Sequence, residues 1–262
     1  MENILDKIIA NKKIEIGQQK ELFSLKEIEN KIQYSKKVLS FKESLKQSST
    51  GIISEFKRRS PSRDWIFKKA KIEDVIPFYS ENGASAISIL TDLNFFGGTL
   101  QDLEKAKNIT ETPLLRKDFM IDEYQLYQAK VYGASAILLI AAALTINETK
   151  KLAKKSKELG LDVLLEIHNE KELNHINEWI DVVGVNNRNL KTFITDVQVS
   201  FDLAEKIPDE FVKISESGIS STQTVKNLQR VGYKGFLMGE NFMKTKDPGK
   251  SLKVFIEELE SK

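Results

Sequence analysis

Short apolar runs alternate with amphipathic helical segments along most of the chain. From Gly51 onward the apolar runs predict eight strands: Ile52–Phe56, Ala86–Leu90, Leu114–Arg116, Ala136–Ile140, Val163–Ile167, Val182–Val185, Val212–Ser215 and Gly235–Met238. The segments that follow them predict helices at Ile72–Asn82, Leu100–Asn108, Glu123–Tyr132, Ile146–Leu159, Glu170–Trp179, Val197–Lys206, Ser221–Val231 and Ser251–Leu259. Strands that alternate with helices are typical of a parallel sheet buried on both faces.

An internal repeat favours a closed barrel over an open sheet. The sequence Gly83-Ala-Ser-Ala-Ile87 recurs as Gly133-Ala-Ser-Ala-Ile137, and Gly232-Tyr-Lys-Gly-Phe236 is a looser third version. Each copy reads as a glycine that ends a helix, followed by small residues that enter a strand. Eight such units predict an α/β fold of the (β/α)8 TIM barrel type. The alternative, an open doubly wound sheet, lacks its Gly-x-Gly-x-x-Gly signature after the first strand.

The first part of the chain has a purely helical pattern that ends near residue 47. Ile4 and Ile8 recur at helical spacing among lysines and glutamates. Ser24 with Glu27 matches a capping box, which predicts a second helix over about 25 to 37. A third, shorter helix follows. No catalytic combination of residues occurs here, so this segment reads as an extension that packs against the barrel.

We expect one domain, 1–262, in which an N-terminal helical extension, 1–48, joins a barrel, 51–262, without a Pro/Gly/Ser-rich linker. The longest apolar run, Ala136 to Leu144, is about half the roughly 18–20 residues that a membrane-spanning helix needs. Charges close to the N-terminus argue against a signal peptide. We therefore expect a cytoplasmic protein with no membrane partner.

Charge and cysteine content exclude several classes of function. The 40 basic and 38 acidic residues leave a formal net charge of +2, which lacks the basic excess of a nucleic-acid-binding protein. The chain has no cysteine, which excludes disulfides, thiolate metal sites and cysteine nucleophiles.

Polar side chains follow seven of the predicted strands, where the active sites of such barrels lie. Glu55 and Lys57 close the first strand and face the same side, although an unpaired charge is costly in a core. Lys117 with Asp118 reads in isolation as a surface pair, and His168 as a residue that packs or caps near its strand end. Seven polar strand ends together favour a functional site.

Two glycine turns follow the seventh and eighth predicted strands. Backbone amides of Ser217-Gly218 and of Gly239-Glu240 can bind a phosphate group near the N-termini of the following helices. Two such turns at adjacent strand ends indicate a phosphorylated small-molecule ligand.

Six segments, in order along nearly the whole chain, resemble the indole-3-glycerol-phosphate synthase family of tryptophan biosynthesis. They are Glu55-Phe-Lys-Arg-Arg-Ser-Pro-Ser62, Leu115-Arg-Lys-Asp-Phe119, Leu165-Glu-Ile-His168, Val185-Asn-Asn-Arg-Asn-Leu190, Ser215-Glu-Ser-Gly-Ile219 and Leu237-Met-Gly-Glu240. The resemblance implies a carboxy-lyase that converts 1-(2-carboxyphenylamino)-1-deoxyribulose 5-phosphate into indole-3-glycerol phosphate, carbon dioxide and water. It also implies that no metal or organic cofactor takes part.

The resemblance assigns roles to individual residues. Lys117 matches the general acid, Glu166 the catalytic carboxylate, and Lys57, with Glu55 beside it, the lysine that contacts the substrate carboxylate and phosphate. Asn186 and Glu216 match polar groups that hold the substrate and the active-site network. The implied substrate-binding residues are Ser60, Ser217, Gly218, Gly239 and Glu240 around the phosphate, Phe96, Phe119 and Leu138 around the anthranilate ring, and Arg188 and Leu190 in the matching loop.

One position departs from the family pattern. After Ser-Pro-Ser the family usually has a basic residue and a glycine, whereas this chain reads Arg63-Asp64-Trp65. We expect this loop to be stiffer or differently shaped, with an effect on loop closure and turnover rather than on the reaction.

Two other functions compete with this interpretation. An enzyme similar to phosphoribosylanthranilate isomerase would explain the phosphate turns, but not the combination of Lys57, Lys117 and Glu166. A barrel that serves only as a binding scaffold would be expected to show gaps among the strand-end charges, and none occurs. We expect a monomer or weak oligomer and leave open its association with other enzymes of the tryptophan pathway.

Overall fold

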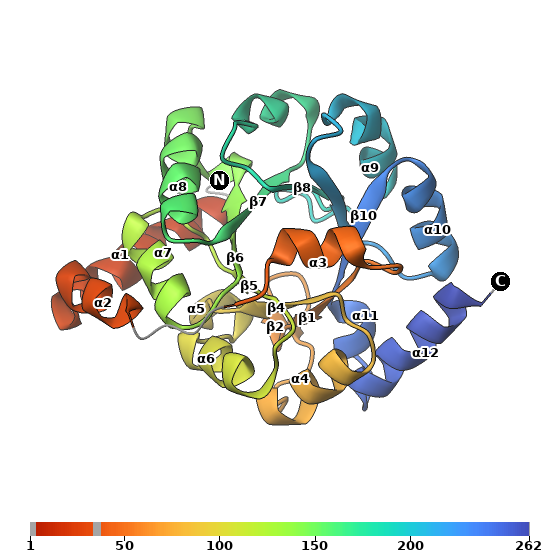
Figure 1. Cartoon of the computed structure of the whole chain (residues 1–262), viewed down its shortest axis with the longest axis horizontal. Helices are drawn as coiled ribbons and strands as arrows, with labels where there is room; N and C mark the ends of the chain where they lie inside the picture. The colour runs from red at the N-terminus through yellow and green to blue at the C-terminus, as the bar shows by residue number, and fades with distance from the viewer. Residues whose placement is uncertain (1–3, 34–37, 262) are drawn as a thin grey trace.

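Eight parallel strands close into a barrel in the computed structural model, which describes residues 4–33 and 38–261 (Figure 1). The strands pair in chain order around the ring, and the last pairs with the first. They are β1 (Ile52–Phe56), β4 (Ala86–Leu90), β5 (Leu114–Lys117), β6 (Ala136–Ile140), β7 (Asp162–Ile167), β8 (Val182–Asn186), β9 (Val212–Glu216) and β10 (Tyr233–Met238). The predicted (β/α)8 barrel is confirmed.

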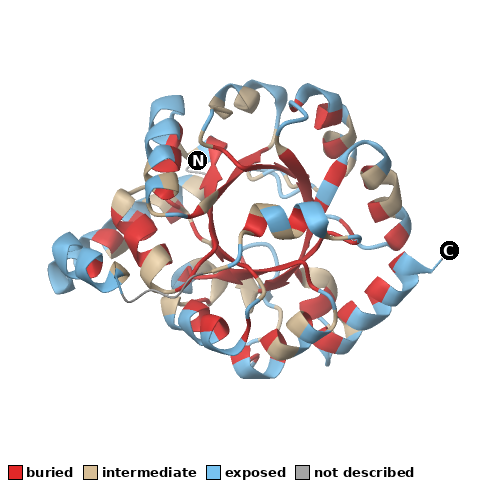
Figure 2. Ribbon diagram, in the orientation of Figure 1, coloured by how far each residue is buried: buried red, intermediate tan, exposed pale blue. Residues whose placement is uncertain are grey.

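Helices surround the ring of strands and bury its outer face. They are α4 (Ile72–Glu81), α6 (Leu100–Ile109), α7 (Glu123–Val131), α8 (Ile146–Glu158), α9 (Gln198–Leu203) with η3 (Ala204–Lys206), α10 (Thr222–Arg230) and α12 (Pro248–Glu260). Figure 2 shows the strands buried along their length, whereas the outward faces of the helices are exposed.

One predicted helix is wrong in length and type. The segment predicted as Glu170–Trp179 forms only a 3-10 helix, η2 (Glu170–His175). The side chain of Asn177 donates to the carbonyl oxygen of His175 and accepts from the backbone N–H of Trp179, each at 3.0 Å. Asparagine competes in this way with helical hydrogen bonds, so the helix ends early.

The repeated glycines end helices as predicted. Gly83 follows α4 with φ 88°, and Gly133 follows α7 with φ 86°. A residue with a side chain rarely adopts this left-handed conformation. Gly232, in the looser copy, has φ 97°. The repeat therefore reflects the same left-handed backbone turn after α4, α7 and α10.

Helix α3 (Phe41–Gln47) closes the N-terminal end of the barrel and runs across the ring of strands in Figure 1. Phe41 and Leu45 are fully buried and belong to the same apolar cluster as the side chains of the barrel interior. The hydroxyl of Ser44 donates to the carbonyl oxygen of Ser85, just before β4. With this end closed, a ligand reaches the barrel from the opposite end.

The first two helices lie outside the barrel beside α7 (Figure 1). Helix α1 (Ile4–Leu22) is followed by α2 (Leu25–Ile32). The predicted capping box is confirmed, because Ser24 and Glu27 satisfy each other's backbone N–H groups. The predicted continuation of α2 over residues 34–37 lies outside the described residues.

Short elements line the C-terminal rim of the barrel. In the loop after β1, β2 (Arg59–Ser60) and β3 (Asp64–Trp65) form a small antiparallel hairpin that the sequence did not predict. Helix α5 (Leu93–Phe96) follows β4, η1 (Ala141–Ala143) follows β6, and α11 (Glu240–Met243) follows β10. Of the residues predicted for the site, Lys57, Ser60, Phe96, Gly239 and Glu240 lie in these loops and short elements.

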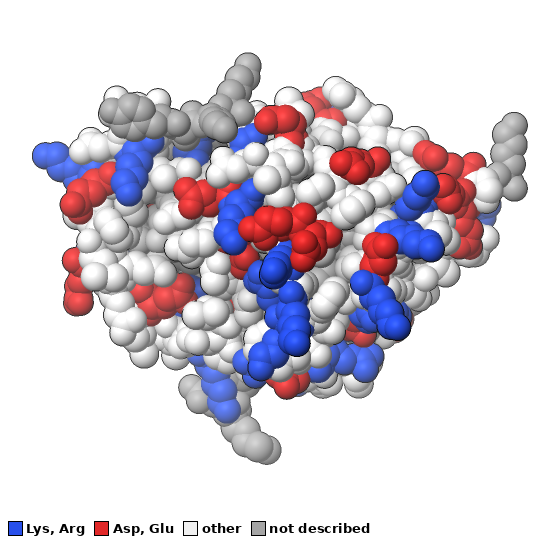
Figure 3. Space-filling model, turned by 90° about the horizontal axis from the view of Figure 1, so that it is seen from below, with Lys and Arg blue, Asp and Glu red and all other residues white. Residues whose placement is uncertain are grey.

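The surface charges are mixed. On the face shown in Figure 3, lysine and arginine side chains lie next to aspartate and glutamate side chains. Among the described residues, no helix is both long enough and apolar enough to cross a bilayer.

Candidate active site

A cavity of about 430 Å³ opens at the C-terminal ends of the strands. All residues that the sequence predicted for the site border it. These are Glu55, Lys57, Ser60, Phe96, Lys117, Phe119, Leu138, Glu166, Asn186, Arg188, Leu190, Glu216, Ser217, Gly218, Gly239 and Glu240. Residues from separate strand ends and loops thus meet at one place because parallel strands in a barrel end at the same rim.

Four charged side chains form a layer at the bottom of the cavity. In barrels of this kind, alternate strands contribute the side chains of each interior layer. Here the alternate strands β1, β5, β7 and β9 carry Glu55, Lys117, Glu166 and Glu216 near their C-terminal ends. In a layer that served only to pack the barrel, these four positions would carry apolar side chains, whereas here all four side chains are charged.

Lys117 is the centre of this layer. Its Nζ atom lies 3.4 Å from Oε2 of Glu166 and 3.3 Å from Oε2 of Glu216. Burial acts to lower the pKa of Lys117, but the charges of Glu216, Glu166 and Glu55 outweigh it and raise the pKa above its usual value. Lys117 is therefore a protonated donor at neutral pH, aimed between two acceptors.

The two carboxylates beside Lys117 differ in proton affinity. Burial raises the pKa of Glu216 to about 7, with the neighbouring charge of Glu166 acting in the same direction against the effect of Lys117. Burial also acts to raise the pKa of Glu166, but Lys117, His168 and a hydrogen bond from Asn186 lower it overall. Glu166 is thus the ionised member of the pair and Glu216 the one that holds a proton most readily.

Glu55 and Lys57, at the C-terminal end of β1, form a close contact in the structure. The Nζ atom of Lys57 lies 2.5 Å from Oε1 of Glu55, and Glu55 is almost completely buried. A side chain at Gly239 would collide with the carboxylate of Glu55, so the glycine leaves room for it. Lys57 itself borders the cavity and is 18% exposed, so a ligand in the cavity can reach its ammonium group.

The walls at the β4–β6 side of the cavity are apolar. The rings of Phe96, from α5, and Phe119, after β5, lie with centroids 6.0 Å apart. Leu138 of β6 adds an aliphatic face, and Ile4 and Ile8 of α1 border the same cavity. This side is suited to a flat aromatic group.

The opposite side, at β9 and β10, has the backbone turns expected for an anion site. Ser217 and Gly218 have φ angles of 68° and 76°, and Gly239 precedes α11. Glu240 lies near two guanidinium groups: Arg63 Nε is 3.2 Å and Arg188 Nη2 is 4.0 Å from its carboxylate. These two arginines offset the carboxylate charge on the side where the phosphate was predicted.

Contacts between loops connect this side of the rim. Arg188 Nη1 donates to Ser62 Oγ at 2.7 Å, so the loop after β8 is joined to the loop after β1. The backbone N–H of Arg188 donates to Oδ1 of Asn186 at 3.0 Å. The position of Arg188 thus depends on both loops.

Sequence reasoning missed two features around the site. Lys12 is almost fully buried although it lies on α1. The signal was present, because Ile8, Lys12 and Ile16 recur at every fourth position, which places the lysine on the buried apolar stripe. His168 was expected only to pack or cap, yet it lies between Glu166 and Glu172. Among the described residues, no group of three His, Cys, Asp or Glu side chains could hold a metal ion.

Solved structures similar to this chain share its fold at low sequence identity. A mutant tryptophan synthase alpha-subunit from Pyrococcus furiosus gives a TM-score of 0.60 with 15% identity, over 81% of this chain and 98% of that one. 3-Hexulose-6-phosphate synthase from Salmonella typhimurium gives a TM-score of 0.62 with 14% identity, over 80% and 98%. At such identities the likeness concerns the barrel alone.

Curated relatives are much closer in sequence. Indole-3-glycerol phosphate synthase from Bacteroides thetaiotaomicron is 51% identical over 260 residues, which cover 99% of this chain and 100% of the relative. The synthase of the same name from Prochlorococcus marinus (strain MIT 9515) is 40% identical over 98% of this chain and 90% of its own. The family model for indole-3-glycerol phosphate synthase matches residues 5–255. The chain therefore belongs to the indole-3-glycerol phosphate synthase family.

Proposed function

We propose that the protein closes the indole ring of indole-3-glycerol phosphate, with Lys117 as the general acid. The substrate is 1-(2-carboxyphenylamino)-1-deoxyribulose 5-phosphate, and the other products are carbon dioxide and water. The observation that carries the proposal is the Lys117 ammonium group, placed between Glu166 and Glu216 at the bottom of the cavity. An apolar wall on one side of it and glycine turns on the other match the aromatic and phosphate ends of this substrate.

The three parts of the substrate find complementary groups. The backbone turns at Ser217-Gly218 and Gly239 suit the phosphate. Phe96 and Phe119 suit the aromatic ring, and Lys57 suits the carboxylate on that ring. This placement brings the ketone carbon of the sugar next to Lys117 and close to the ring carbon that attacks it.

Ring closure forms a carbon–carbon bond between the carboxylate-bearing ring carbon and the ketone carbon. Lys117 donates a proton to the ketone oxygen as negative charge develops there. The bond to the carboxylate then breaks and its electron pair returns to the ring as carbon dioxide leaves. Loss of the new hydroxyl group as water, with a proton from the adjacent methylene carbon, completes the indole.

Glu166 is the base that we assign to the last step. It is ionised, lies 3.4 Å from Lys117, and can receive the methylene proton. The ammonium group of Lys57, released from the ring carboxylate once carbon dioxide has left, donates a proton to the departing hydroxyl group. Every step is redox-neutral and consists of proton transfer or of heterolytic bond formation or cleavage. The side chains of this chain are therefore sufficient for the proposed mechanism.

The experiment that tests the proposal follows indole fluorescence after the purified protein is mixed with the carboxyphenylamino sugar phosphate. We expect Lys117→Ala to lower kcat by roughly 10²–10⁴-fold, as for loss of a general acid. Lys151→Ala is a matched control, because Lys151 is an exposed lysine outside the cavity. Full activity of Lys117→Ala contradicts the assignment of the acid, and lack of turnover in the unmodified protein contradicts the function.

The competing functions give different outcomes in the same assay. A phosphoribosylanthranilate isomerase-like enzyme converts phosphoribosylanthranilate and leaves the carboxyphenylamino substrate intact. A binding scaffold raises its melting temperature with a substrate analogue but produces no indole. Neither alternative explains why Lys57, Lys117 and Glu166 all border one cavity.

A further inference from the structure

His168 stands directly behind the proposed base. It follows Glu166 by two residues at the end of β7, so both side chains face the same side. Its Nε2 atom lies 3.4 Å from Oε1 of Glu166, and its Nδ1 atom lies 3.3 Å from Oε2 of Glu172. The His168 ring is only 11% exposed and does not border the cavity. A substrate in the cavity therefore contacts Glu166 directly, whereas His168 contacts Glu166 at a carboxylate oxygen without bordering the cavity itself.

Glu172 is a fixed partner of this histidine. Its carboxylate accepts the backbone N–H of His168 at 2.7 Å and the side-chain amide of Asn169, also at 2.7 Å. It belongs to η2, which begins at the Asn169 cap. A carboxylate with these bonds is held next to the imidazole before any ligand binds.

These contacts extend the charged layer into a row in which a histidine and a lysine alternate with three carboxylates. The row runs from Glu172 through His168, Glu166 and Lys117 to Glu216. Lys117 faces two buried carboxylates. Because two negative charges close together repel each other and only one cation lies between them, binding of one proton by the pair is favoured. A second cation on one side decides which carboxylate keeps that proton.

The surroundings of the two carboxylates differ on this point. Nε2 of His168 lies 3.4 Å from Oε1 of Glu166, at ion-pair distance although Nε2 has no hydrogen-bond partner among the described residues. Glu166 also has a hydrogen bond from Asn186. Oε1 of Glu216 is buried and has no hydrogen-bond partner among the described residues. Ionisation is therefore supported at Glu166 and opposed at Glu216.

We propose that His168 is a positioning residue: as an imidazolium bound by Glu172, it keeps Glu166 ionised and leaves the shared proton to Glu216. The consequence for catalysis rests on the proposed function, in which Glu166 is the base. The assignment of charge to His168 rests on the contacts alone.

Within the part of the chain that the structure describes, the charged groups that act on His168 are acidic. They are Glu166 on β7, Glu172 on η2 and, further away, Glu216 on β9. Burial acts to lower the pKa of His168, but the hydrogen bond to Glu172 and these charges raise it overall. His175 provides the contrast: its Nδ1 atom pairs with the Thr149 hydroxyl at 2.8 Å, and burial lowers its pKa.

The chain has only these two histidines, so each imidazole can be followed by ¹H–¹⁵N correlation spectra of the ¹⁵N-labelled protein. His175→Asn leaves a single imidazole and fixes the assignment. We expect His168 to titrate above the ordinary imidazole pKa of about 6.5, and His175 below it. In Glu172→Gln, which keeps the size of the side chain, we expect the His168 titration to move down by about one pH unit or more. Titration of His168 at or below the ordinary value in the unmodified protein overturns the proposal.

Turnover provides the second measurement. In His168→Asn we expect the acidic limb of the kcat/KM profile to move up by about one to three pH units, because Glu166 loses a cation at close range. Glu172→Gln should move it in the same direction by less, and His175→Asn should leave it in place. Coincident profiles of His168→Asn and the unmodified protein overturn the proposal. If no synthase turnover is found at all, the proposed function fails, while the imidazole titration still decides the charge of His168.

Discussion

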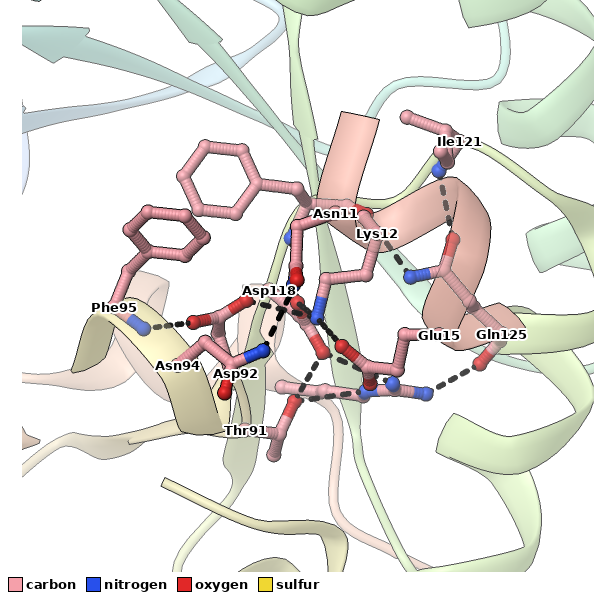
Figure 4. Close-up of polar contacts among 12 residues, drawn as sticks. Asn11, Lys12, Glu15, Thr91, Asp92, Asn94, Phe95, Asp118, Ile121 and Gln125 are labelled. Carbon is pink, nitrogen blue, oxygen red and sulfur yellow. Dashed lines mark hydrogen bonds and ion pairs between the residues drawn. The ribbon is translucent and has the colours of Figure 1, made fainter. Parts of the chain in front are cut away.

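The Nζ atom of Lys12 on α1 lies 2.9 Å from a carboxylate oxygen of Asp118, the residue that follows Lys117 (Figure 4). The same atom lies 2.9 Å from Asp92, whose other oxygen caps α5. All three side chains are at most 1% exposed. Burial acts to lower the pKa of Lys12, but the two aspartates raise it overall. A helix outside the barrel thus supplies the cation for two buried carboxylates at the rim.

Lys12→Met tests how much the native structure depends on this cation. Asp118 keeps the guanidinium of Arg116 at 3.1 Å, but Asp92 has no other cation within ion-pair distance among the described residues. Loss of one partner of a buried ion pair typically destabilises a protein by about 3–5 kcal/mol. We expect a loss of this size in the free energy of unfolding, measured by urea titration.

Lys20→Met is the matched control for this prediction. Lys20 lies on the same helix and pairs with Asp122 at 2.7 Å, but its side chain is 44% exposed. Exposed pairs contribute at most about 1 kcal/mol. Lys12, Asp92 and Asp118 form the Lys12 cluster. Equal losses in the two variants would show that burial of the Lys12 cluster adds nothing to its effect on stability.

Asp118 should make stability fall at acid pH. Burial opposes ionisation of Asp118, but Lys12, Arg116 and the Thr91 hydroxyl lower its pKa to about 2. A carboxylate with a lowered pKa contributes stability above its unfolded pKa of about 3.9, and the contribution is lost as the pH falls through the folded value. We expect about 2 kcal/mol to disappear between about pH 4 and pH 2.

The measurement compares unfolding free energies of the unmodified protein and Asp118→Asn over this range. The variant starts from a lower stability at neutral pH, because an amide cannot match the charge of Lys12. Its curve should be flatter below about pH 4, since it lacks the titrating group. Parallel curves would mean that Asp118 does not carry this part of the acid sensitivity.

The barrel was predictable because each of its units repeats the same local pattern. The glycines at 83 and 133 and the polar ends of the strands are all visible as neighbours in the sequence. The Lys12 cluster joins the extension to two loops distant in sequence, so only the apolar stripe around Lys12 gave a local signal. The 3-10 helix at Glu170–His175 was hidden because Asn177 acts through hydrogen bonds that helical periodicity does not reveal.

Asp64 adopts a backbone conformation that favours glycine, the residue that the family pattern has at this position. Its φ is 54°, in the left-handed region, at the position where the family pattern has glycine. The conformation costs an ordinary residue about 1–2 kcal/mol, although aspartate tolerates it better than most. Its carboxylate accepts from Arg59 Nε at 2.8 Å, across the β2–β3 hairpin. The loop is therefore formed without glycine and is restricted by a side chain.

Asp64→Gly should free this loop. Relief of backbone strain and the larger entropy of the unfolded chain oppose each other, so we expect the unfolding free energy to change by less than about 1 kcal/mol. Because the loop borders the cavity, kcat and KM should rise together. Asp64→Asn separates the causes, since asparagine tolerates the same backbone but lacks the charge. If Asp64→Asn changes the kinetics as much as Asp64→Gly, the ion pair with Arg59 rather than the backbone restricts the loop.

Glu216 should give stability the opposite dependence on pH from that of Asp118. Its folded pKa, raised mainly by burial to about 7, exceeds the ordinary value of 4.5. A carboxyl group with a raised pKa contributes stability that is fully present below the unfolded pKa and is lost as the pH rises through the folded value. The loss therefore falls between about pH 4.5 and pH 7.

In Glu216→Gln, which cannot ionise, this decline should be absent, whereas the exposed control Glu178→Gln should retain it. Urea unfolding at several pH values measures both, and an unchanged decline in Glu216→Gln would mean that Glu216 is already ionised at pH 5 and does not hold the shared proton.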